Sequence, residues 1–157
     1  MAFFKISENT LLYSYLGVTL ASPIVASLGT AYWGGHIVSS LAHEGLLRTG
    51  ILATVQSVVG FIFGALLDEP MQQYISDKEL SSCISMLTGS LVAGGIIYTI
   101  GFAAVKAGLI STALTLPAAA ALVIIPAVAE GVCPFLFAKL VDFAKSTHIL
   151  EEIKVAS

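Results

Sequence analysis

Residues Cys83–Val105 read CISMLTGSLVAGGIIYTIGFAAV and contain no charged side chain. As a helix, an apolar run of 18 or more residues is long enough to cross a hydrocarbon core of about 30 Å. Three similar runs lie elsewhere in the chain, at Leu11–Trp33, Gly50–Leu67 and Gly108–Ala129. The sequence therefore predicts an all-α, polytopic membrane protein with four transmembrane helices in two hairpins.

The composition agrees with this interpretation. Charged residues make up 11% of the chain, whereas a soluble domain carries about 25%. The polar pieces between the runs are too short to bury a core of their own, so we expect one membrane domain over residues 1–157. The net charge of −3 and the lack of a basic stripe argue against a nucleic-acid partner. Membrane lipids and other membrane proteins are the expected partners.

The first run has the clearest membrane signature. Aromatic residues, which favour the membrane–water interface, frame it at both ends: Tyr13, Tyr15, Tyr32 and Trp33. Pro23 lies near its middle and predicts a kink. We expect a retained span and not a cleaved signal peptide, because the single Lys5 is offset by Glu8 and the run is long.

Local signals mark the ends of the third and fourth runs. Ser76–Glu79 reads SDKE, the pattern of a capping box that opens a helix. Only Lys106–Gly108 separates the third run from the fourth, which predicts a tight hairpin with Gly108 as the helix stop. Pro117 and Pro126 fall inside the fourth run, so it is expected to be the least regular helix.

The tail, residues 134–157, differs from the spans because it is amphipathic. On a helix its apolar residues share one side, opposite Lys139, Asp142 and Ser146; they are Leu136, Phe137, Leu140, Val141 and Ala144. Such a segment can lie along the membrane interface or pack on a partner as a separate C-terminal helix. Alternatively, it simply continues the fourth helix beyond the membrane.

The placement of Lys and Arg predicts an orientation. With four spans both termini share one side, and that side would hold five of the seven basic residues: Lys5, Lys78, Lys139, Lys145 and Lys154. Arg48 and Lys106 would lie on the other side. The positive-inside rule then places both termini on the cytoplasm-like face.

Small residues recur at four-residue spacing in three of the spans. They are Ser22, Ala26 and Thr30 in the first, Gly60 and Gly64 in the second, and Ser85, Gly89 and Ala93 in the third. Helices in lipid associate where small residues let their backbones approach closely. These rows are therefore candidate helix-packing or interaction surfaces, either for a partner or within the chain's own bundle.

The predicted span interiors contain no Asp, Glu, Lys, Arg or His. Their polar atoms come from a few uncharged residues: Gln56, Tyr98, Thr99, Thr112 and Thr115. Because ion and proton pathways usually need an ionisable group at membrane depth, this pattern argues against a pump. Pro117 and Pro126 leave open a broken helix around a substrate site.

The densest group of polar side chains outside the spans lies between residues 36 and 48. Together with Gln56 of the second span it forms a second candidate site, which consists of His36, His43, Glu44, Arg48 and Gln56. On a helix the two histidines would lie about 10.5 Å apart along the axis, too far for one metal ion. Cys83 and Cys133 fall on the same predicted side, where they would be bridged, acylated or free thiols. We expect no catalytic residue, metal or cofactor.

The function expected from these patterns is non-enzymatic. The leading interpretation is a structural or accessory subunit of a larger membrane assembly, because the charge-poor spans carry many small-residue faces. A small channel or carrier formed by self-association is the first alternative, and a membrane-inserted secreted effector is the second. An enzyme acting on lipid would need the residues between His36 and Arg48 to converge.

Overall fold

The computed structural model describes residues 4–34, 46–108, 116–147 and 149–153. Its elements in chain order are strand β1 (Phe4–Ser7), helices α1 (Glu8–Gly34), α3 (Leu46–Gln72), α4 (Lys78–Lys106) and α5 (Leu116–Ser146), and strand β2 (Leu150–Ile153). All four of these helices are long and apolar enough to cross a membrane. The predicted all-α class with four such helices is confirmed, and the two four-residue strands are an addition.

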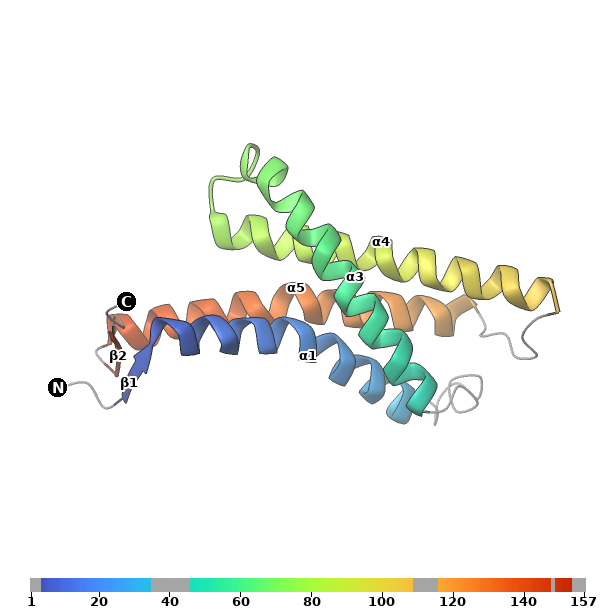
Figure 1. Cartoon of the computed structure of the whole chain (residues 1–157), viewed down its shortest axis with the longest axis horizontal. Helices are drawn as coiled ribbons and strands as arrows, with labels where there is room; N and C mark the ends of the chain where they lie inside the picture. Colours follow the sequence, from blue (N-terminus) through green and yellow to red (C-terminus); the bar gives the residue numbers. More distant parts are fainter. Residues whose placement is uncertain (1–3, 35–45, 109–115, 148, 154–157) are drawn as a thin grey trace.

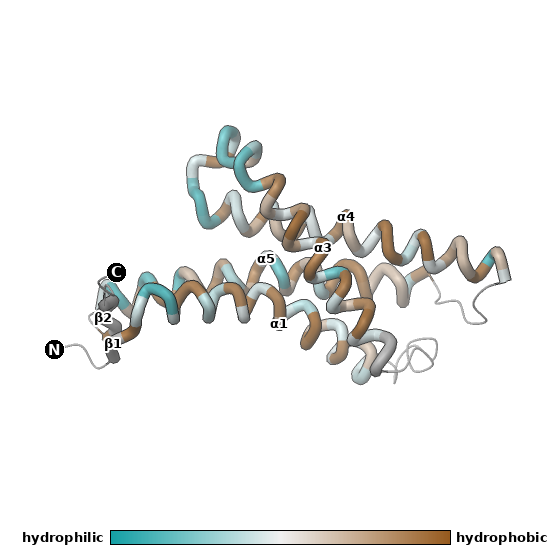
Figure 2. Tube along the Cα trace, viewed as in Figure 1, coloured by the Kyte–Doolittle hydropathy of each residue, from teal (hydrophilic) through white to brown (hydrophobic). Residues whose placement is uncertain are grey.

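The helices form a ring in which α1 and α4 each contact both α3 and α5. Helix α3 crosses obliquely over the others (Figure 1). Strand β1 pairs in parallel with β2, with Phe4 opposite Leu150 and Ser7 opposite Ile153. This pairing joins the start and the end of the described chain at one end of the bundle. The residues are hydrophilic there and at the turn between α3 and α4, whereas the middle of the bundle is mainly hydrophobic (Figure 2).

Both ends of α4 show why the helix has these bounds. Its N-cap is Asp77, whose carboxylate accepts hydrogen bonds from the backbone N–H groups of Glu79 and Leu80. The capping box predicted a cap at Ser76, so that prediction is wrong by one residue. At the other end, Gly108 has a φ of +73°, which strongly favours glycine. The prediction that Gly108 ends the helix is confirmed.

The boundaries of α5 differ from those predicted for the fourth span. The helix is described from Leu116 onward, and residues 109–115, on which the predicted tight hairpin falls, lie outside the described residues. Pro117 therefore lies in the first turn, where a missing N–H leaves no helical hydrogen bond unmade. The helix then continues through Pro126 and Pro134 to Ser146.

The tail is consequently not a separate amphipathic helix. Residues 134–146 are the last turns of α5, and Leu150–Ile153 form β2. The physical reason is visible in residues 131–138, which read GVCPFLFA and carry no charge. The apolar character of the fourth helix therefore extends well beyond Ala129, and of the two interpretations of the tail, the continuous helix is the observed one.

The distribution of residues between interior and surface is inverted relative to a soluble protein. Among the described residues, the buried apolar side chains other than Met86 and Leu122 are those of alanines and of Pro23, Pro126 and Pro134. Polar side chains share this interior: Thr19, Ser27, Thr49, Gln56, Ser57, Ser81, Ser85, Ser90 and Glu130. Many of the large apolar side chains point outward, including Val25, Ile62, Leu66, Ile100, Leu116 and Leu140. In water this arrangement would forgo most of the hydrophobic stabilisation of folding.

Glycines bring α3 and α4 into close contact. A Cβ added to Gly89 would lie 2.4 Å from the backbone nitrogen of Gly64 and 2.5 Å from the carbonyl oxygen of Gly60. Real Cβ atoms do not approach backbone so closely, so only glycine fits at position 89. The Gly60–Gly64 pair singled out in the sequence therefore packs on the neighbouring helix of the same chain.

Candidate functional site: a buried polar layer

Among the residues that the structure describes, one ionisable side chain is fully buried. Glu130 is 0% exposed and sits close to the middle of α5. The predicted fourth span ended at Ala129, one residue before Glu130, so the absence of ionisable residues inferred for the span interiors does not extend to the interior of this helix bundle. The argument against ion or proton chemistry that rested on that absence no longer holds.

The sequence of α5 turns Glu130 inward. The buried residues Ala118, Leu122, Pro126 and Pro134 recur at intervals of four and so occupy one face of the helix. Glu130 belongs to the same row. The sequence does contain a signal for this position: residues 131–138 are apolar, so Glu130 has apolar sequence both before and after it.

The surroundings of the Glu130 carboxyl group are small and uncharged. Its nearest interacting side chain is Ser90 of α4, and a Cβ added to Gly60 of α3 would lie 3.2 Å from Oε2. Within the described part of the chain, neither carboxyl oxygen has a hydrogen-bond partner of good geometry. Buried polar groups are nearly always satisfied, so this acid stands out as a site that needs a ligand or a proton.

Gln56 adds a second polar group at the same level. Its side-chain Nε2 donates to the carbonyl oxygen and to Oγ of Ser90, both at 3.4 Å, and to the carbonyl oxygen of Val123 at 3.2 Å. The amide thus links α3 to α4 and to α5. Because the Ser90 hydroxyl accepts from Gln56, its own proton is available for the carboxyl group of Glu130.

Two further bonds connect α1 to this level. Ser22 Oγ donates to the carbonyl oxygen of Ala129 in α5 at 3.1 Å, and Ser57 Oγ of α3 donates to the carbonyl oxygen of Leu20 at 3.2 Å. We call the set of residues that supply these side chains the central polar layer: Ser22, Gln56, Ser57, Ser90 and Glu130. All four helices contribute to it.

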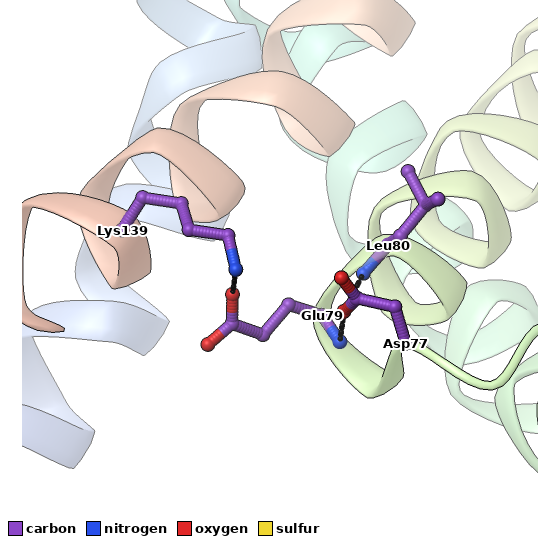
Figure 3. Close-up of polar contacts among 4 residues, drawn as sticks. All are labelled: Asp77, Glu79, Leu80 and Lys139. Atoms are coloured by element: carbon purple, nitrogen blue, oxygen red, sulfur yellow. Dashed lines mark hydrogen bonds and ion pairs between the residues drawn. The ribbon is translucent and has the colours of Figure 1, made fainter.

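A separate ion pair lies nearer the end of the bundle that carries the termini. Lys139 of α5 pairs with Glu79 in the first turn of α4, next to the Asp77 cap (Figure 3). The Lys139 ammonium group also lies 5.5 Å from the centre of the Phe135 ring. Both partners of the pair are partly exposed, so this contact between α4 and α5 contributes little to stability.

An open groove lies between the start of α1 and the end of α5. Its volume is about 380 Å³, and its lining includes Glu8, Tyr15, Asp142 and Lys145. The lining combines charges of both signs with apolar side chains. Nothing in the structure selects a ligand for it, and we assign it no role.

The candidate interaction residues differ in their burial. Gly60, Gly64, Ser85, Gly89 and Ala93 are buried between the helices. Ser22, Ala26 and Thr30 of α1 are only half-buried, and the most buried row of that helix is displaced by one residue: Thr19, Pro23, Ser27 and Ala31. Only Ser22 of the predicted row in α1 bonds to another helix, because Thr30 Oγ1 donates to the carbonyl oxygen of Ala26.

The second candidate site is largely outside the described residues. His36, His43 and Glu44 fall there, as do Thr112 and Thr115, and the side chain of Arg48 is not described either. Cys83 and Cys133 are free, half-buried thiols. Among the described residues, no group of three potential ligands is placed to hold a metal ion.

Comparison with known proteins adds no relative. No family model, no curated protein and no solved structure matches this chain.

Proposed function

We propose that this chain is an integral membrane protein with four spans, and that it is a non-enzymatic structural or accessory subunit of a larger membrane assembly. The inverted distribution of side chains supports the membrane location. Lipid tails solvate outward-facing Leu, Ile, Val and Phe side chains, whereas the small and polar residues inside satisfy one another. The partners are lipids together with another membrane protein or a second copy of this chain.

The observation that carries the subunit role is a row of small residues on the outside of α4. Gly95, Thr99 and Ala103 are exposed and recur at intervals of four. A Cβ added to Gly95 would meet nothing within 4 Å, and Thr99 Oγ1 already donates to the carbonyl oxygen of Gly95 at 2.7 Å. We call these three residues the outer α4 row. Small residues that are not used inside the bundle leave room for a further helix.

Extraction in a mild detergent followed by native mass measurement tests this proposal. The expected mass exceeds the 16.3 kDa of one chain, and the double substitution Gly95→Leu, Thr99→Leu reduces it to that of one chain. Ile96→Leu, at an exposed neighbouring position, is the matched control and leaves the assembly intact. A wild-type protein that is a monodisperse monomer would overturn the proposal.

The same proposal includes an orientation, with both termini on the cytoplasm-like side. Its support is the excess of lysines on the terminal side of a four-span arrangement and the β1–β2 pairing at one end of the bundle. Cysteines placed at positions 5 and 107, after replacement of Cys83 and Cys133, test it. An impermeant thiol reagent applied from one side labels one of the two positions; equal labelling from that side contradicts the four-span topology.

A further inference from the structure

Glu130 presents an electrostatic problem that packing alone does not solve. An ionised carboxylate in an apolar interior is costly unless a charge or several hydrogen bonds compensate it. Among the described residues, no charged side chain interacts with Glu130, and Ser90 is the side chain that does. From α3 the neighbour is Gly60, and from α1 it is Ser22, which bonds the carbonyl group of the preceding Ala129.

We propose that Glu130 and Ser90 form a binding site for a monovalent cation, either H⁺ or Na⁺. The site goes beyond a subunit's structural role, because it makes the interior responsive to the cation content of the medium. Its ligands are the two unpaired carboxyl oxygens and the Ser90 hydroxyl. The site offers only three oxygens, and a Cβ added to Gly60 would lie 3.2 Å from Oε2; both features favour the smaller ion, since H⁺ needs no coordination shell.

The hydrogen bonds around Ser90 explain how the site can exist without the cation. Gln56 Nε2 donates to Ser90 Oγ, so the serine hydroxyl can turn its proton toward the carboxylate of Glu130. In this arrangement of Gln56, Ser90 and Glu130, the Ser90 hydroxyl offers one hydrogen-bond donor to the ionised carboxylate. When H⁺ is bound the carboxyl group is neutral, and when Na⁺ is bound the ion balances the charge of the carboxylate, so in either case that donor is no longer required. The same three residues therefore support both states.

Labelling with a hydrophobic carbodiimide tests the site in the full chain, either in detergent or within its assembly. The reagent adds to protonated carboxyl groups, and peptide mass mapping locates the adduct. If the site binds H⁺, Glu130 is labelled at low pH and labelling is lost as the pH rises. If it also binds Na⁺, NaCl protects Glu130 from labelling at constant pH, whereas KCl at the same ionic strength does not.

Two results would overturn the proposal. One is labelling of Glu130 that changes with neither pH nor NaCl, which would make it a permanently neutral structural acid. The other is an absence of labelling at every pH while Glu69, exposed on α3, reacts in the same sample. Both results are measured on the wild-type chain, so neither test requires a substituted protein to fold.

Variants refine the assignment. Glu130→Gln preserves the shape and removes the adduct at this position, whereas Glu69→Gln leaves the pH dependence of Glu130 labelling unchanged. Ser90→Ala shifts the pH at which labelling of Glu130 is lost, because it removes the side chain that interacts with the carboxyl group. An unchanged midpoint in a Ser90→Ala protein of normal helix content would exclude Ser90 from the site.

Discussion

The α3–α4 pair and the α1–α5 pair hold together by different means. Between α3 and α4, Gly60, Gly64 and Gly89 allow direct contact of backbones. Between α1 and α5, Ser22 donates a side-chain hydrogen bond to the carbonyl oxygen of Ala129, and an open groove lies between the start of α1 and the end of α5. Apolar helices of similar composition therefore differ in how strictly their contacts fix one helix against its neighbour.

The largest effect is expected from a substitution at the close contact between α3 and α4. Gly89→Ala places a Cβ against the backbone of α3 and forces the helices apart, so we expect a loss of about 1–3 kcal/mol of unfolding free energy, as for overpacked cores. Unfolding in mixed detergent micelles measures this loss. Gly101→Ala on the same helix is the matched control, since nothing lies within 4 Å of a Cβ added there and Gly101 is not part of the outer α4 row. Equal stability of the two variants would contradict the close α3–α4 contact.

A smaller effect is expected from the polar link between the two pairs. Gln56→Leu removes the bonds from α3 to Ser90 and to Val123, and we expect a loss of about 1–2 kcal/mol, which is typical of polar contacts between membrane helices. The same unfolding measurement applies. Thr54→Val is the control, because its hydroxyl bonds only to the carbonyl oxygen of Gly50 in its own helix. A Gln56→Leu protein as stable as this control would show that the amide does not hold the helices together.

The smallest effect is expected at the contact between α1 and α5. Ser22→Ala removes one bond between α1 and α5, for an expected loss of about 0.6 kcal/mol. Thr30→Ala, which removes a bond inside α1, serves as its control. If Ser22→Ala proved as damaging as Gly89→Ala, the two pairs would not differ in the way their contacts indicate.

Sequence patterns predicted the number of spans but not all of their limits. Gly108 correctly marked the end of α4, which stops two residues before it at Lys106, because a positive φ restricts the choice of residue. The predicted end of the fourth helix at Ala129 was too early, since α5 continues to Ser146. Pro117 suits a first turn as well as a kink, and a single glutamate followed by apolar sequence resembles the end of a span. Hydropathy alone does not distinguish these cases.

The central polar layer shows a similar division. Gln56 was visible as the polar residue of the second span, but its partners Ser90 and Val123 are 34 and 67 residues away along the chain. No local pattern links residues at such separations. Glu130 was missed because the predicted span ended one residue before it, although the apolar stretch 131–138 already argued for a longer helix.

The sequence by itself determined that this chain forms four long apolar helices, because composition and run length act locally along the chain. Only the tertiary structure decided which residues those helices turn inward. Helix crossing brings Gly60 and Gly89 into contact and places Glu130 beside Ser90. The physical reason is that in lipid the outward face is selected by hydropathy, whereas the inward face is selected by how closely particular backbones approach.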